Sequence, residues 1–193
     1  IFVTGSDSSL DISHSLISDN TATSTGGGIA ATSGSSIFMD HIQLEYNHAG
    51  TGGALYCFDA TCTMHNISIQ FNSANDGGGI YCYNNANCAI SSTSSIHNNA
   101  AVYYGAGIYC SDATCTMQYS DMYSNKANTL AGGAYILGSI ASFDHVNITT
   151  NDGKSEGGGI YVKQGTSILT VRESLFQGNI ATSGTAIKSV ADG

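Results

Sequence analysis

The sequence predicts an all-β fold, a right-handed parallel β-helix of about seven coils with about 26 residues per coil. Three observations lead to this prediction. One motif recurs along the whole chain, side-chain character alternates with a period of two, and turn-forming residues stand at fixed places in each repeat. Hydrophobic residues make up 41% of the 193 residues, which is enough for one domain with a buried core. We therefore expect a single β-helix domain over residues 1–193.

The first part of the repeat is a group of small residues followed by an apolar one. Because glycine adopts backbone conformations closed to other residues, the group predicts a tight turn before a strand. Its seven copies are Gly26-Gly27-Gly28-Ile29, Gly52-Gly53-Ala54-Leu55, Gly77-Gly78-Gly79-Ile80, Gly105-Ala106-Gly107-Ile108, Gly132-Gly133-Ala134-Tyr135, Gly157-Gly158-Gly159-Ile160 and Gly184-Thr185-Ala186-Ile187. The last residue of each copy is expected to point into the core.

The second part of the repeat is an asparagine a few residues before the glycine group. The seven asparagines are Asn20, Asn47, Asn72, Asn99, Asn125, Asn151 and Asn179. An apolar residue stands three positions before each of them, at Ile17, Leu44, Ile69, Ile96, Met122, Ile148 and Phe176. A small residue stands two positions after each of them, at Ala22, Ala49, Ala74, Ala101, Ala127, Gly153 and Ala181.

Local alternation decides between helical and β repeats. Ile67, Ile69 and Phe71 alternate with Ser68 and Gln70, which is typical of a half-buried strand. Helical solenoids have longer units and 3.6-residue periodicity, and the leucine pattern of leucine-rich repeats is absent. Matching positions one repeat apart should therefore stack about 4.8 Å apart. In such a stack the asparagines are expected to form a ladder in a turn, each amide bonding the next.

The six cysteines form three close pairs in three consecutive coils, and alternation places all of them inside. The pairs are Cys57 with Cys62, Cys82 with Cys88, and Cys110 with Cys115. We predict that each pair is a disulfide closing a corner of its own coil, which implies an oxidising compartment. Free buried thiols and a metal site are the alternatives. A metal is disfavoured for two reasons. The inward positions that the cysteines share from coil to coil are apolar, and three pairs do not divide into sets of four thiolates.

Two sequons and a set of histidines lie on the predicted outer surface. Asn66-Ile67-Ser68 and Asn147-Ile148-Thr149 are candidate N-glycosylation sites, and both asparagines have the parity that faces solvent. N-linked glycans are the only non-protein groups expected, and no cofactor is predicted. His14, His41 and His145 share one column, six residues before the asparagine. They are interpreted as solvated residues beside a turn, with a surface metal or a pH-sensitive pair as the alternative.

Tyrosines follow the glycine group in four repeats. Tyr56, Tyr81, Tyr109 and Tyr161 should point outward, and the first three should stack in consecutive coils. They form a candidate contact stripe for a neighbouring molecule or a sugar ring. The alternative is that the tyrosines stack on one another and shield the sheet.

Charge and the outward columns argue against several functions. The net charge is -9 with five Lys and Arg residues, so nucleic acid is not an expected partner, and no apolar run is long enough for a membrane-spanning helix. Polysaccharide hydrolysis needs converging carboxylates. The outward columns beside the asparagine do not put acids in neighbouring coils, and Asp59 and Asp112 are interpreted as turn formers two coils apart. No catalytic residue is therefore assigned.

The two motifs resemble the repeats of chlamydial polymorphic outer-membrane proteins and of pectin-lyase-like β-helices in protist surface proteins. Phe176-Gln177-Gly178-Asn179 matches one motif in its Phe form, and Gly52-Gly53-Ala54-Leu55 is close to the other. The resemblance covers nearly the whole chain. It implies a right-handed β-helix at the cell surface or secreted, with a role in adhesion or scaffolding, and it transfers no catalytic residue.

These observations together predict an extracellular, non-catalytic, structural or adhesive protein. Since residue 1 is Ile and the repeat runs from end to end, the chain is expected to be a segment of a larger repetitive assembly, with fibres formed by head-to-tail stacking. Its expected partners are further copies of itself or glycans of a host or matrix surface. The alternatives are a polysaccharide lyase or hydrolase relative and a carbohydrate-binding module that uses the tyrosines.

Overall fold

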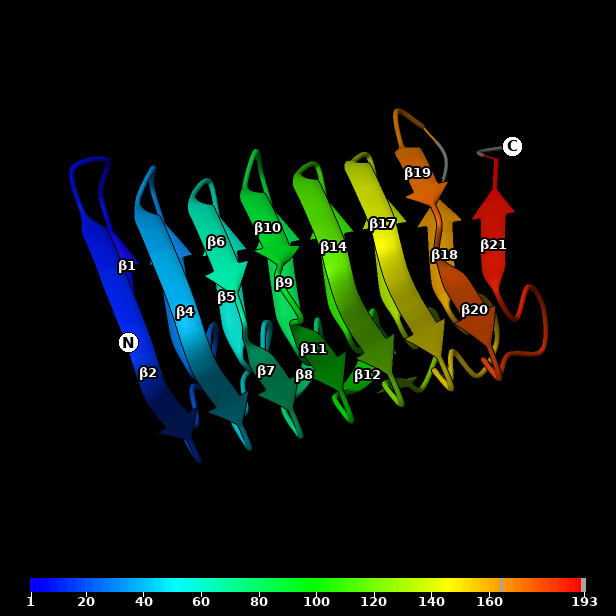
Figure 1. Cartoon of the computed structure of the whole chain (residues 1–193), viewed down its shortest axis with the longest axis horizontal. Coiled ribbons are helices and arrows are strands. Elements are labelled where there is room, and N and C mark those ends of the chain that lie inside the picture. The colour runs from blue at the N-terminus through cyan, green and yellow to red at the C-terminus, as the bar shows by residue number, and fades with distance from the viewer. Residues whose placement is uncertain (164, 192–193) are drawn as a thin grey trace.

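The computed structural model describes residues 1–163 and 165–191, and throughout them the fold is a parallel β-helix. Figure 1 shows the coils following one another along the long axis, from β1 and β2 in blue to β21 in red. The strand pairings are parallel, and the paired residues lie about one repeat apart, as between Ile69 and Ile96. The predicted fold class, with about seven coils of about 26 residues, is confirmed. No helix among the described residues could cross a membrane.

The strands form three sheets that run along the axis. The first has eight strands: β1 (Phe2–Thr4), β3 (Ile29–Thr32), β5 (Leu55–Phe58), β9 (Ile80–Tyr83), β13 (Ile108–Ser111), β16 (Ala134–Leu137), β18 (Ile160–Lys163) and β21 (Ile187–Val190). The second has ten: β2 (Ser9–Ser18), β4 (Ser36–Glu45), β6 (Thr61–His65), β7 (Ser68–Gln70), β10 (Asn87–Ser91), β11 (Ser95–His97), β14 (Thr114–Tyr123), β17 (Ile140–Thr149), β19 (Ile168–Arg172) and β20 (Leu175–Gln177). The third has three: β8 (Ser73–Asp76), β12 (Ala100–Tyr104) and β15 (Lys126–Ala127).

The core lies between the first and second sheets. It consists of columns of inward side chains, one residue per coil, and the column three positions before the asparagines is buried as predicted in the coils of Leu44, Ile69, Ile96 and Ile148. A second column, two positions after the glycine group, runs through the cysteines Cys57, Cys82 and Cys110. Stacking of like positions therefore buries a continuous apolar interior.

Corners of the coils depend on residues with left-handed backbone. The residue before each asparagine of the ladder has this conformation, even where it is bulky, as at Tyr46 (φ 54) and Phe71 (φ 55). A second such position bends the second sheet, and His14 (φ 48) and His41 (φ 54) occupy it. Asp59 (φ 48) and Asp112 (φ 49) take a third, at corners after the first sheet, which fits their interpretation as turn formers.

The predicted register is wrong by one residue in one coil. The motif was read as Gly132-Gly133-Ala134-Tyr135, with Tyr135 in the core. In the structure Ala134 pairs with Ile108 and points inward, and Tyr135 pairs with Tyr109 on the outer face. The reason is that Ala131 (φ 60) adopts the left-handed turn conformation that Gly105 (φ 59) supplies in the preceding coil.

Candidate functional site

The asparagine ladder is a continuous chain of amide hydrogen bonds along the axis. Asn99 shows the repeating unit: its Nδ2 donates to the Ile69 carbonyl at 2.9 Å and to Asn125 Oδ1 at 3.0 Å. Its Oδ1 accepts from the backbone N–H of Asn72 at 3.0 Å and from Asn72 Nδ2 at 3.0 Å. The same contacts link all seven predicted asparagines, Asn20, Asn47, Asn72, Asn99, Asn125, Asn151 and Asn179. The five inner members are buried, and each is satisfied by its neighbours.

The cysteines stack in two columns inside the helix, as predicted, but their bonding differs from the prediction. Cys57 is bonded to Cys62, and Cys110 is bonded to Cys115. The pair between them, Cys82 and Cys88, consists of free buried thiols, so the third predicted disulfide is not formed.

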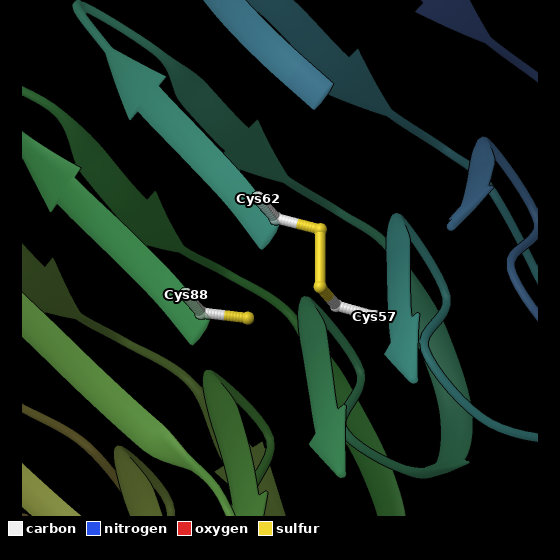
Figure 2. Close-up of side chains that lie close together, drawn as sticks. All are labelled: Cys57, Cys62 and Cys88. Atoms are coloured by element: carbon white, nitrogen blue, oxygen red, sulfur yellow. A yellow bond between two sulfur atoms is a disulfide. The ribbon is translucent and has the colours of Figure 1, made fainter. Parts of the chain in front are cut away.

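The corner of this middle pair is also different. It holds one residue more than the other two, and both Asn84 (φ 56) and Asn85 (φ 62) are in left-handed conformation there. The Sγ atoms of Cys57, Cys62 and Cys88 lie within 4.8 Å of one another. Figure 2 shows Cys88 pointing from its own coil toward the Cys57–Cys62 bridge. Of the described residues, such groups of three candidate metal-ligating side chains are formed by cysteines, here and at Cys82, Cys110 and Cys115.

The two free thiols are expected to be unreactive while the protein is folded. Cys82 and Cys88 are 0% and 1% exposed, and burial raises the pKa of Cys88 well above its usual range, helped by its contact with Cys82. We therefore predict no alkylation of the native chain and alkylation of two thiols after unfolding without a reductant. Mass spectrometry of the alkylated chain gives the count. Labelling of the native chain, or a count of six after unfolding, would contradict the structure.

The tyrosine stripe is longer than predicted and its rings face one another. Tyr56, Tyr81, Tyr109 and Tyr161 lie outside the first sheet as expected, and Tyr135 completes the row. Ring centroids along the row are 5.5, 4.6, 5.2 and 5.3 Å apart, and neighbouring rings are nearly parallel. Each ring face is therefore covered by the next ring. Two interpretations were open for these tyrosines, shielding of the sheet and stacking on sugar rings. The covered ring faces favour the first.

The tyrosine stack should make the fold sensitive to alkali. Burial raises the pKa of Tyr81 to about 12, and the Asp76 carboxylate and neighbouring tyrosines add to the effect. Burial also raises the pKa of Tyr109 and Tyr135. An acid whose pKa is higher in the folded chain stabilises the fold fully below the unfolded value of about 10, and that stabilisation is lost as pH rises through the folded value.

We therefore expect the free energy of unfolding to fall between about pH 10 and 12. Circular dichroism and tyrosinate absorbance, recorded together across this range, test the expectation. Tyrosines that titrate near their ordinary pKa while the β-sheet signal is unchanged would show that the stack does not exist in solution.

The two sequon asparagines differ in exposure. Asn147 is exposed on β17, and its Nδ2 donates to Asp121 Oδ1 at 2.8 Å. Asn66 is half-buried at the bend of the second sheet, donates to Asp40 Oδ1 at 3.0 Å and accepts from Thr93 Oγ1 at 3.2 Å. Since a glycosyltransferase must reach Nδ2, Asn147 is the more accessible of the two candidate glycosylation sites. Occupancy of either remains a prediction.

The three predicted column histidines lie at the bend of the second sheet. The His14 and His41 rings stack with centroids 4.8 Å apart and an interplanar angle of 4°. His145 lies apart from them, with Nδ1 3.0 Å from Asp144 Oδ1 and Nε2 2.8 Å from Glu173 Oε2. The sequence predicted the shared column. It did not predict that His41 contacts the Asp40 carboxylate and that His145 contacts the Asp144 carboxylate.

Comparison with known proteins adds one short match. Residues 14–32 match the Chlamydia polymorphic membrane protein repeat. The chain is similar to that repeat. The matched segment contains Ile17, Asn20 and the glycine group ending at Ile29, which are both hallmarks of the repeat unit. Searches of curated proteins and of solved structures gave no significant match. The match and the β-helix together fit a repeat protein of this type, and they do not bear on pectin-lyase-like specificity.

Proposed function

We propose that the chain is a structural or adhesive β-helix of a cell surface or of the extracellular space, and that it performs no catalysis. The observation that carries the proposal is the uninterrupted stacking of like positions from coil to coil, in the core, the asparagine ladder and the tyrosine row. Such regularity builds a stiff rod, since each coil is fixed by backbone and side-chain bonds to both neighbours. Similarity to the membrane-protein repeat supports a surface location.

The distribution of acidic side chains supports the non-catalytic role. Asp40 and Asp144 share a column but lie four coils apart, and each bonds the histidine that follows it. Asp59 and Asp112 are turn residues two coils apart. Glycoside hydrolysis needs two carboxyl groups within about 5–10 Å on either side of one bond. Asp144 and Glu173 lie this close together, but the His145 ring stands between them and bonds both, at 3.0 and 2.8 Å, which leaves no place for a glycosidic bond.

Self-association by stacking is the assembly that this architecture favours. A coil presents backbone N–H and C=O groups along the axis and an asparagine amide in register with them, as between Asn72 and Asn99. A coil of a second copy could accept the same bonds, so contacts between molecules would repeat those within one molecule. The net charge of -9 opposes this association at low salt, and screening should promote it.

Electron microscopy with light scattering tests the structural role. We expect rods longer than one chain, and their length should increase with protein concentration and with salt. A monodisperse monomer at all concentrations would rule out fibres made by this segment alone. The adhesive role is tested on the same material by binding to glycan arrays and host-cell or matrix surfaces. Turnover of a polysaccharide by the purified chain would overturn the non-catalytic proposal.

A further inference from the structure

His14 and His41 form a pair in neighbouring coils. The residues on either side of them are paired in register, Ser13 with Asp40 and Ser15 with Ile42, so the two histidines occupy the same bend position. Both have left-handed backbone and both are exposed. Their rings are 4.8 Å apart and nearly parallel. Two imidazoles with nearly parallel planes are thus held side by side on the surface.

The ring of His41 is oriented by a carboxylate. Its Nδ1 lies 2.9 Å from Asp40 Oδ2, and Asn66 Nδ2 donates to the other oxygen of Asp40 at 3.0 Å. At this distance the Asp40 carboxylate accepts the Nδ1 proton of His41. Nε2 of His41 then carries the free lone pair. Histidines that bind metals are commonly oriented in this way, by donating the other ring N–H to a carboxylate.

Space and further ligands are present beside the pair. His14 and His41 line a surface depression of about 370 Å³ together with Ser15, Leu16 and Gln43. The Gln43 amide oxygen and water molecules can complete a coordination sphere there. The acidic chain, with a net charge of -9, also raises the local concentration of cations.

We infer that Nε2 of His14 and Nε2 of His41 bind one divalent late first-row transition metal ion, such as Zn²⁺ or Cu²⁺. Imidazole nitrogen bonds these ions at about 2.0–2.1 Å, so binding requires both rings to rotate out of their parallel stacking until the two Nε2 atoms point toward a common ion. Asp40 acts as a positioning residue through His41. The site is independent of the proposed structural or adhesive function and of the buried cysteines.

The other bend histidine provides a contrast within the same chain. His145 has carboxylate oxygens at both ring nitrogens, from Asp144 and Glu173, and its neighbour in the preceding coil is Tyr119, whose ring stacks on it at 4.7 Å. It has neither a free nitrogen nor a second imidazole. His145→Gln is therefore a matched control at the same position of the fold.

Calorimetric titration with ZnSO₄ and then CuSO₄, in a buffer that does not coordinate metals, tests the inference. We expect one site per chain, tighter for Cu²⁺ than for Zn²⁺. Either His14→Gln or His41→Gln should weaken binding at least tenfold, and His145→Gln should leave it unchanged. In NMR spectra, the ring signals of His14 and His41 should shift with Zn²⁺ while those of the other histidines stay in place.

Two results would overturn the inference. One is the absence of heat and of ring shifts up to millimolar metal. The other is binding that persists in the double variant His14→Gln/His41→Gln. Asp40→Ala separates positioning from ligation, because it removes the acceptor of the Nδ1 proton and leaves both ligands. We expect it to weaken binding less than loss of either histidine, and an effect as large as that of His41→Gln would make Asp40 itself a ligand.

Discussion

Asn99→Asp should lower the free energy of unfolding by about 3–5 kcal/mol at neutral pH. The substitution hardly changes shape, but it replaces a buried amide donor by an oxygen. Nδ2 of Asn99 donates to the Ile69 carbonyl and to Asn125 Oδ1, and both acceptors would then face a carboxylate. Asn99 is 1% exposed, so water cannot compensate for the lost bonds. Urea unfolding followed by circular dichroism gives the change in free energy.

The same variant should depend on pH in a defined direction. A buried carboxyl that faces other oxygens has a folded pKa raised above the unfolded value of about 3.9. The stabilisation from the protonated form is present below the unfolded pKa and is lost as pH rises through the folded pKa. The variant should therefore be closest to the parent chain at about pH 4 and fall away toward neutrality.

Asn98→Asp is the control for this prediction, because it makes the same chemical change one residue earlier. Asn98 is exposed and has left-handed backbone (φ 54). Asp19 already occupies the equivalent place in the first coil (φ 58). We expect a change below about 0.5 kcal/mol. If Asn99→Asp and Asn98→Asp lowered the free energy of unfolding equally, the buried ladder asparagine would contribute no more to stability than the exposed residue beside it.

The repeat made much of this fold predictable from sequence. An apolar residue three positions before an asparagine, repeated seven times, fixed both the core column and the ladder, because stacked coils bring like positions together. The alternation of inward and outward side chains along each strand predicted Cys57 and Cys62 inside and Tyr81 outside, and the structure has them there. Alternation and periodicity are thus strong signals in a solenoid, because each coil repeats them.

Turn geometry was harder to predict. Glycine near a turn suggests positive φ, so the turn of the copy Gly132-Gly133-Ala134 was assumed to start at Gly132. This assumption shifted the predicted register by one residue. In the structure Ala131 holds the left-handed conformation, which an alanine seldom adopts. Aligning Tyr135 with Tyr109 would have found the register, because both are followed by an inward residue. No single-residue preference would place Tyr46 or Phe71 in left-handed turns, although both stand before a ladder asparagine, where every coil has this conformation.

Pairings between side chains depended on distances that spacing does not give. The Cys82–Cys88 pair has one residue more between its cysteines than the other two pairs, a signal that the prediction did not use, and its thiols are free. The column shared by His14 and His41 was visible, but the stacking of their rings and the orienting role of Asp40 required coordinates. Local sequence therefore predicted where the candidate site residues stand, and three-dimensional contacts decide what they can bind.

Phe143→Ala should also destabilise the chain strongly, by about 3–5 kcal/mol. Phe143 is a fully buried side chain on β17 and fills the core column between Met117 and Val171. Removing its ring leaves a cavity between coils whose backbones are fixed by hydrogen bonds to both neighbours, so the site cannot collapse. Thermal and urea unfolding measure the loss.

Phe38→Ala is the matched control, since it removes the same side chain from the opposite face of the same sheet. Phe38 is 38% exposed on β4 and touches His65 edge to face, with ring centroids 5.2 Å apart. Loss of that contact should cost about 1 kcal/mol or less. The difference between the two variants measures the inward and outward alternation on which the β-helix rests. Equal destabilisation would mean that the second sheet does not have an inner and an outer face. The architecture of stacked coils would then be incorrect.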